Sequence, residues 1–382
     1  MKDSMVEEVR EAARGVVEEY PRSYMLECAR EGRFPQEMWD ALGTQGLLGL
    51  GVPEALGGIG GGVQAMVALC EAMTSVGTTS AFFAITSFSR LPIIKYGTVQ
   101  QCEKFVKPTI TGDAKICFAL TEPDAGTNSF AIKSRATRTD SGWALSGQKA
   151  FITGAKMADY MLVIARTESA EAAANRTQGL SLFVISTKSP GIEYQPMPID
   201  AVAGDTQYSV FFDNVQIGEE ALIGEEGRGV KYLFDGLNPE RMITAIQAVG
   251  FGSYALDKGV AYAKERAPFG QSIGSYQGIQ HPMARAKARL EAARLMVYDC
   301  ARRFDEGESI GATANMAKLL ATEAADEALD IAIQAHGGSA FDASNDVHTL
   351  WQHIRLLRII PINNEMVLNH IAEHVLGLPK SY

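Results

Sequence analysis

The stretch KICFALTEPDAGTN, residues 115–128, marks the point where the sequence pattern changes. Up to about Ile110, runs rich in Ala, Leu and Met with helical spacing predict an α-helical unit. From Lys115 onward Ile116, Phe118 and Leu120 recur at every second position, which predicts a β-strand. The segment 121–128 that follows is a polar, glycine-containing turn, whose main-chain N–H groups and two hydroxyls suit an acceptor-rich ligand. An ordinary loop has the same composition.

The pattern on the far side of this stretch is first β and then α. Short β-like runs occur at 160–165, 180–185 and 208–212, separated by turn residues. Apolar residues then recur at steps of three and four over 283–304 and again over 316–335, which predicts long bundle helices. We therefore expect an N-terminal α-helical domain (1–112), a middle β domain (113–222) and a C-terminal four-helix bundle (223–382). The absence of βαβ alternation disfavours a doubly wound parallel sheet.

Composition excludes several classes of protein. The 382 residues carry a formal net charge of -10 and no cluster of basic and aromatic residues, so a nucleic-acid partner is not expected. No apolar run reaches the length of a membrane span. The five cysteines form no CxxC pair, and residues 1–20 do not resemble a signal or transit peptide. These features predict reduced thiols and a cytoplasmic protein that does not bind membranes.

Two short patterns invite functional readings that the sequence does not favour. In the glycine run 57–62, the third glycine of a GxGxxG motif would fall on Val63, and no strand precedes it, so we expect a flexible loop. His370, Glu373 and His374 match an HxxEH zinc pattern. No further ligand follows them, and we expect helix-surface histidines and no bound metal.

Two other segments combine groups that could bind a dinucleotide. One contains Arg266, Phe269 and Gln277, a cationic fork beside aromatic side chains, which would suit a pyrophosphate with its adenosine. The other ends a helical pattern with Gln334 and a glycine pair. Taken singly, each is equally consistent with an exposed helix end or a helix C-cap.

Together and in this order, the segments resemble the acyl-CoA dehydrogenase family over essentially the whole chain. Residues 120–128 resemble the family signature LTEPxAGSD, with Asn128 in place of the usual Asp. Residues 149–153 resemble its flavin-contacting K-x-W/F-I-T strand. The segments 266–277 and 334–338 resemble those through which a neighbouring subunit completes the FAD site. Ala340 and Phe341 depart from the usual Gly and Tyr.

The resemblance implies FAD as the cofactor and assigns residues to it. Those implied for the isoalloxazine side are Phe118, Leu120, Thr121, Thr127, Phe151 and Thr153, with Thr153 at the redox edge of the ring. Those implied for the rest of the cofactor, chiefly its ADP half, are Arg266, Phe269, Gln277, Gln334, Gly337, Gly338, Asn363 and Glu365. Because part of this set comes from a second subunit in the family, the resemblance also implies a homo-oligomer, at least a dimer and commonly a tetramer.

The implied reaction is the α,β-dehydrogenation of an acyl-CoA or other pantetheine thioester, with electrons passing to an electron-transferring flavoprotein. A carboxylate removes the α-proton while the β-hydride goes to the flavin. Three alternatives remain open: action on an acyl group bound to a carrier protein, thioester reduction or desulfination, and a non-catalytic structural homologue.

The position of the base distinguishes this chain from many relatives. Their catalytic Glu lies in a Y-E-G-T-type segment near the C-terminus, where this chain has Pro361; Glu365 falls four residues later. The second known position, that of isovaleryl- and long-chain acyl-CoA dehydrogenases, matches Glu240. Asn238 and Arg241 then flank it as thioester contacts, together with Thr127. A surface Glu–Arg pair at a helix start is the alternative.

Arg90 is the remaining candidate. By resemblance its segment, residues 87–92, closes the far end of the acyl cavity, where an unpaired arginine would be costly. It could recognise a polar or anionic distal group of the substrate. We expect instead that it points outward or pairs with a core carboxylate.

Overall fold

The structure is a computed structural model and describes residues 2–169, 178–199, 206–342 and 344–380. The chain divides into two compact units. The sheet unit comprises Glu27–Gly61 and Ser80–Glu240, and the helical unit comprises Met1–Leu26, Gly62–Thr79 and Arg241–Tyr382. The chain passes between the units at four points, and two of these fall inside helices, in α2 (Arg22–Glu31) and in α8 (Gly229–Glu265). These two helices therefore contribute residues to both units.

One mixed sheet organises the sheet unit. Its strands are β1 (Ile116–Ala119), β2 (Arg135–Thr139), β3 (Gly142–Thr153), β4 (Tyr160–Arg166), β5 (Leu180–Ser186), β6 (Ile192–Pro196), β7 (Gln207–Gly218) and β8 (Leu222–Ile223). Their order is β6-β7-β3-β2-β4-β5-β8, and β1 pairs in parallel with β4. The β-like runs expected at 160–165, 180–185 and 208–212 lie in β4, β5 and β7, which confirms them.

Helix α5 (Ala81–Tyr96) packs on this sheet. The other short helices of the sheet unit are α3 (Gln36–Thr44), α6 (Val99–Gln101) and α7 (Pro108–Thr111). The Ser80 hydroxyl caps α5 by accepting from the Phe83 N–H. One turn further, the Thr86 hydroxyl donates to the carbonyl of Ile116 at 3.3 Å and accepts from its N–H at 3.2 Å. These two contacts hold α5 against β1.

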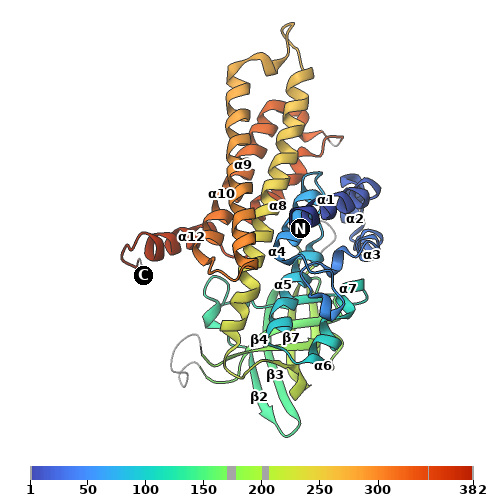
Figure 1. Ribbon diagram of the computed structural model, residues 1–382, viewed down its shortest axis with the longest axis vertical. Helices are drawn as coiled ribbons and strands as arrows, with labels where there is room; N and C mark the ends of the chain where they lie inside the picture. Colours follow the sequence, from blue (N-terminus) through green and yellow to red (C-terminus); the bar gives the residue numbers. More distant parts are fainter. Residues whose placement is uncertain (1, 170–177, 200–205, 343, 381–382) are drawn as a thin grey trace. The chain divides into compact units, whose positions relative to one another are not determined.

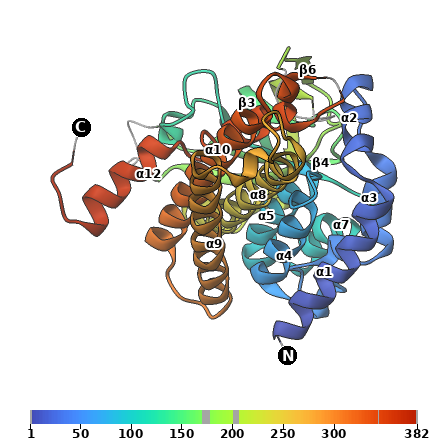
Figure 2. The same ribbon diagram turned by 90° about the horizontal axis from the view of Figure 1, so that it is seen from above.

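The helical unit is built around the parts of α8, α9 (Gln277–Asp305) and α10 (Gly311–His336) that run side by side (Figures 1 and 2). The remaining helices are α1 (Lys2–Glu19), α4 (Gly62–Thr74), α11 (Leu350–Leu357) and α12 (Asn364–His370). The seam expected on α9 is buried from Met283 to Cys300, as predicted. The seam expected on α10 is partly wrong, because Leu320 is 48% exposed. Helices α8 and α10 approach each other closely at Gly252, where an added Cβ would lie 2.8 Å from the Cα of Ala325. A residue with a side chain would therefore push the two helices apart.

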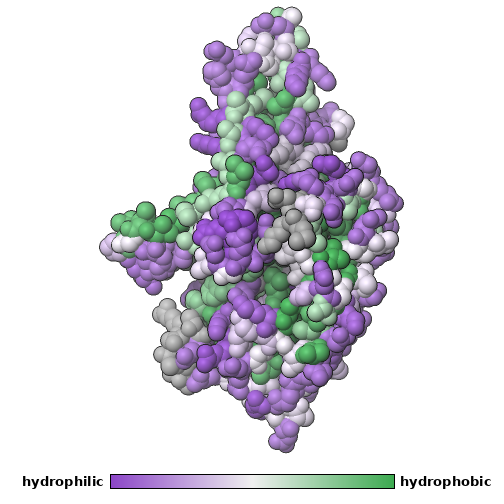
Figure 3. Space-filling view, viewed as in Figure 1, coloured by the Kyte–Doolittle hydropathy of each residue, from purple (hydrophilic) through white to green (hydrophobic). Residues whose placement is uncertain are grey.

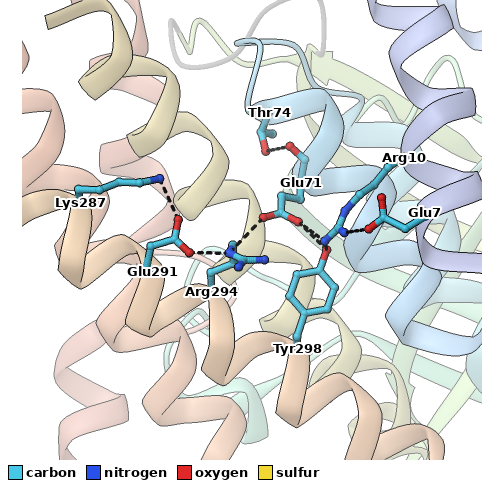
Figure 4. A network of polar contacts seen from close by, with 8 residues as sticks. All are labelled: Glu7, Arg10, Glu71, Thr74, Lys287, Glu291, Arg294 and Tyr298. Atoms are coloured by element: carbon cyan, nitrogen blue, oxygen red, sulfur yellow. Dashed lines mark hydrogen bonds and ion pairs between the residues drawn. The ribbon is translucent and has the colours of Figure 1, made fainter. Parts of the chain in front are cut away.

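A polar network joins α1, α4 and α9 within the helical unit (Figure 4). The carboxylate of Glu71 on α4 accepts from Arg10 on α1 at 3.1 Å and from the Tyr298 hydroxyl on α9 at 2.5 Å. Arg10 also donates to the Tyr298 hydroxyl at 2.8 Å. Arg294 extends the network toward the α9 surface. Because each charge has an opposite partner, the network ties α1 to the bundle without an uncompensated buried ion.

Within the described ranges, all five cysteines are free and buried. No helix in those ranges is long and apolar enough to cross a bilayer, and no cluster of three or more His, Cys, Asp or Glu side chains there could hold a metal ion.

Candidate functional site

An exposed aromatic side chain on a strained backbone marks the end of β3. Pairing between β3 and β7 shifts register between Lys149 and Ile152, and within this bulge Phe151 adopts a φ of 59°. A bulky residue at positive φ is an outlier that the surrounding structure must stabilise. Phe151 is 56% exposed, whereas its neighbours Ala150 and Ile152 are buried. The bulge thus displays a flat aromatic surface on the sheet unit.

The turn after β1 is hydrogen-bonded to β3 next to Phe151. The Ala150 N–H donates to the Thr121 carbonyl at 2.9 Å. Leu120 and Thr121 are half-buried, and Phe118 meets Phe88 edge-on at 5.4 Å. Five of the six residues expected on the isoalloxazine side (Phe118, Leu120, Thr121, Phe151 and Thr153) therefore come from β1, its turn and the end of β3. The sixth, Thr127, lies further along the same turn and is exposed.

A buried ion pair fixes that turn to β3. Lys149 donates to the Glu122 carboxylate at 2.9 Å and to the Leu120 carbonyl at 3.0 Å. Glu122 also accepts the main-chain N–H groups of Lys133 and Ser134, at 2.6 and 3.0 Å. Burial opposes the charge on Glu122, but Lys149 and these N–H donors outweigh it and lower the Glu122 pKa. Burial lowers the pKa of Lys149 to about 8, against the opposing pull of Glu122.

The last residue of β3, Thr153, pairs in register with Gln207 at the start of β7. Gly154 follows with a φ of 61°, and a Cβ there would lie 2.1 Å from the Phe82 ring of α5. Only glycine fits at that position, so α5 and the end of β3 determine where Thr153 lies. Sequence reasoning missed Gln207, because no local pattern relates it to Thr153.

The residues expected to serve the ADP half lie at two helix ends of the helical unit. Arg266 and Phe269 are exposed in the connection that follows α8, Gln277 is exposed as the first residue of α9, and Phe269 is 84% exposed. Gln334, Gly337 and Gly338 are exposed at the end of α10, where Gly337 has a φ of 59°. The ring of Tyr262 in the last turns of α8 stacks on buried His336 at the end of α10, 4.5 Å between centroids. The structure therefore brings the two helix ends together.

Glu240 lies in the interior of a long helix. Because α8 begins at Gly229, Pro239 is not in the first turn, and the alternative reading of a Glu–Arg pair at a helix start is wrong. A proline at this depth removes an N–H from the helical ladder and would be costly unless the site compensates for it. Glu240 and Asn238 are half-buried and Arg241 is 8% exposed, so none of the three is an ordinary surface residue.

The C-terminal segment that carries Pro361 is held by a buried lysine. Lys318 on α10 donates to the carbonyls of Arg358 and Ile362, at 3.1 and 2.8 Å, and to the Asn364 side chain at 2.7 Å. Burial is the main cause that lowers the Lys318 pKa, to about 7. Sequence reasoning missed this residue, although a lone lysine among the alanines of 314–325 was a signal of it.

The two other residues proposed near Pro361 lie at the start of α12. The Asn363 side chain caps this helix by accepting from the Met366 N–H at 2.9 Å. Glu365 is exposed in the first turn.

Arg90 does not point outward, and among the described residues no carboxylate pairs with it, so our expectation for it is wrong. Its guanidinium is buried and donates to the carbonyls of Leu48, at 2.7 Å, and Leu50, and to the Thr109 hydroxyl at 3.3 Å. Burial lowers its pKa to about 9. These contacts favour a structural role, because they occupy donors of the buried guanidinium with groups of the protein, and they lend no support to acyl recognition by Arg90.

Comparison with known proteins matches the chain over its length. Models of the N-terminal, middle and C-terminal domains of acyl-CoA dehydrogenases match residues 4–113, 117–215 and 227–376. The chain is 38% identical to the acyl-CoA dehydrogenase FadE12 of Mycobacterium tuberculosis, covering 98% of this chain and 96% of that protein.

Two further relatives bear on the chemistry. The chain is 32% identical to the caffeyl-CoA reductase-Etf complex subunit CarC of Acetobacterium woodii, covering 92% of this chain and 93% of that protein. Butyryl-CoA dehydrogenase from Megasphaera elsdenii has a similar structure, with a TM-score of 0.91 at 28% identity over 97% of this chain and 98% of that one.

Proposed function

This chain belongs to the acyl-CoA dehydrogenase family, and from that premise we propose that it binds FAD and oxidises an acyl-CoA thioester to the trans-2-enoyl thioester, with Glu240 as the base. The single observation that carries the assignment of the base is the location of the candidate carboxylates. Glu240 is half-buried inside α8, whereas Glu365 is exposed and Pro361 has no proton acceptor. A base must be oriented and shielded from bulk water to act on a weakly acidic C–H group.

The residues around Phe151 fit the isoalloxazine ring. A planar aromatic surface, held at positive φ and 56% exposed, lies beside the half-buried turn residues Leu120 and Thr121. When bound, FAD supplies the electron sink for the β-hydride. In our proposal Phe118, Leu120 and Phe151 pack against the ring, and the hydroxyls of Thr121, Thr127 and Thr153 donate to its polar edges.

We propose further roles for the residues near Glu240 and at the helix ends. Asn238, Arg241 and Thr127 would contact the thioester and its pantetheine and nucleotide arm. The ADP half of an FAD bound to a partner subunit would meet Arg266, Phe269, Gln277, Gln334, Gly337 and Gly338, with Asn363 and Glu365 completing the cofactor contacts. The exposure of Arg266 and Phe269 supports this, because an 84% exposed phenylalanine is costly unless another surface covers it.

An oligomer of at least two and commonly four copies is part of the proposal. Figure 3 shows apolar surface over α12 and the residues after it. Leu368, Val375, Leu376 and Leu378 are between 44% and 66% exposed there. Apolar area of this kind on a described surface supports contact between copies of the chain.

We propose that the protein is cytoplasmic, that it passes electrons to an electron-transferring flavoprotein, and that it has the three-domain division 1–112, 113–222 and 223–382. The family-model matches support the division. The relative from Acetobacterium woodii, a reductase in a complex with Etf, supports such a partner and makes thioester reduction the second candidate function. Carrier-bound acyl groups would use the same pantetheine contacts.

The test follows flavin reduction in the purified protein. The unmodified protein should be yellow and release one FAD per chain on denaturation. Anaerobic mixing with a panel of saturated acyl-CoA thioesters should bleach the flavin, and Glu240→Gln should slow bleaching by a factor on the order of 10²–10⁴ while keeping FAD. Glu365→Gln is the matched carboxylate variant: because Glu365 is proposed as a cofactor contact, its FAD content is measured first, and the flavin that remains bound should bleach at the normal rate. Colourless protein would contradict the proposal, and a loss confined to Glu365→Gln would move the base. Oxidation of the reduced enzyme by enoyl thioesters alone would favour the reductase.

A further inference from the structure

Gln207 and Thr153 face each other across the β3–β7 pair. They are register partners, and the Gly154 N–H donates to the Thr206 carbonyl at 2.8 Å beside them. The Thr153 hydroxyl oxygen lies 3.1 Å from Oε1 of Gln207 and 2.9 Å from its Nε2. The sheet therefore holds an amide against the hydroxyl that ends the flavin-facing strand.

Because both amide atoms are within reach, the hydroxyl has a partner in either orientation. It can accept from Nε2, or it can donate to Oε1, by rotating its own O–H bond while every heavy atom stays in place. An apolar side chain at position 207 would offer neither partner, and a carboxylate would offer only an acceptor. The amide thus leaves Thr153 able to act as donor or acceptor toward a third group.

We propose that Gln207 is a positioning residue that lets the Thr153 hydroxyl serve both oxidation states of the bound flavin. This inference rests on the proposed function, in which Thr153 meets the redox edge of the ring. Toward an oxidised ring, which presents an acceptor, the hydroxyl donates while it accepts from Nε2. Toward a reduced ring, which presents an N–H group, the hydroxyl accepts while it donates to Oε1. Gln207 therefore adjusts the flavin midpoint potential without touching the substrate.

The substitution Gln207→Met keeps the length of the side chain and removes both partners. With reduced flavin, the hydroxyl proton of Thr153 would then have no acceptor. With oxidised flavin, the Thr153 hydroxyl would still donate to the ring, and only one lone pair of its oxygen would lack a donor. A missing donor to a lone pair costs less free energy than an O–H group without an acceptor. The variant should bind reduced flavin less well relative to oxidised flavin, so the midpoint potential becomes more negative. A tenfold change in that ratio corresponds to about 30 mV for a two-electron couple.

The experiment is a spectroelectrochemical titration of the FAD-loaded protein, of Gln207→Met and of Gln216→Met. Gln216 is an exposed residue of the same strand and controls for the chemical change. A potential about 30 mV more negative in Gln207→Met alone, with full FAD content, is the expected result. An unchanged potential, an equal shift in Gln216→Met, or loss of FAD from Gln207→Met alone would overturn the inference. An unmodified protein without FAD would instead contradict the proposed function.

Discussion

Removing the lysine of the buried pair should destabilise the sheet unit more than any surface substitution. In Lys149→Met the side chain keeps its length but loses both hydrogen bonds, and Glu122 stays buried with only two main-chain donors. Lys149 is fully buried and the Glu122 side chain is 6% exposed, so water cannot replace the lost ammonium. Breaking a buried pair by removing one partner costs about 3–5 kcal/mol.

The same substitution on an exposed pair of the same loop provides the control. Lys133 bonds Asp124 at 2.9 Å, but both side chains are about three-quarters exposed, so Lys133→Met should leave stability nearly unchanged. Adding Glu122→Gln to Lys149→Met removes the orphaned charge, so the double variant should lose less stability than the sum of the two single variants. A coupling of roughly 1–3 kcal/mol is expected.

The assay is urea unfolding followed by tryptophan fluorescence, which reports the sheet unit through buried Trp143. Lys149→Met should lower the unfolding midpoint strongly and Lys133→Met should not. Because Lys149 also holds the Leu120 carbonyl, the first variant should lose FAD on dilution faster than the second. Equal unfolding midpoints for Lys149→Met and Lys133→Met would refute the reasoning. So would a stability loss in the double variant equal to the sum of the losses in Lys149→Met and Glu122→Gln.

Three further predictions concern the helical unit. Burial lowers the pKa of His353 to about 4, with Arg22 adding to the effect. This folded pKa is below the unfolded value near 6.5, so the unfolded chain binds the proton first as the pH falls. The free energy of unfolding should therefore be highest above pH ~6.5 and should decrease by up to about 3 kcal/mol as the pH falls toward 4. In His353→Phe the urea midpoint should decrease less between pH ~6.5 and 4 than in the unmodified protein. The same decrease in both proteins would contradict the prediction. Tyr298→Phe removes a hydroxyl bonded to Glu71 and should cost about 1.5–3 kcal/mol in urea unfolding followed by far-UV circular dichroism, whereas an unchanged midpoint would show that the network is redundant. Arg266→Ala should lose FAD and the oligomer together, which size-exclusion chromatography with flavin absorbance checks; a yellow, fully assembled variant would speak against the partner-subunit role.

The sequence by itself determined the features that depend on neighbours along the chain. The change from helical to two-residue periodicity at residue 115, the β runs and the α9 seam follow from local spacing, and each is confirmed. Contiguous motifs also carried the family resemblance, which the comparisons confirm. The choice of Glu240 over Pro361 needed only the residue types at two positions, and it stays a prediction until flavin reduction is measured.

Only the tertiary structure decided which side chains meet. Lys149 lies 27 positions from Glu122, Gln207 lies 54 from Thr153, and Lys318 lies 46 from Asn364. These partners are brought together by strand register and by helix-to-loop packing, and hydrophobic periodicity encodes neither. The same limit explains the error at Arg90. A sequence shows that a buried cation must be compensated, but only packing shows that main-chain carbonyls, which every residue carries, are what compensate it.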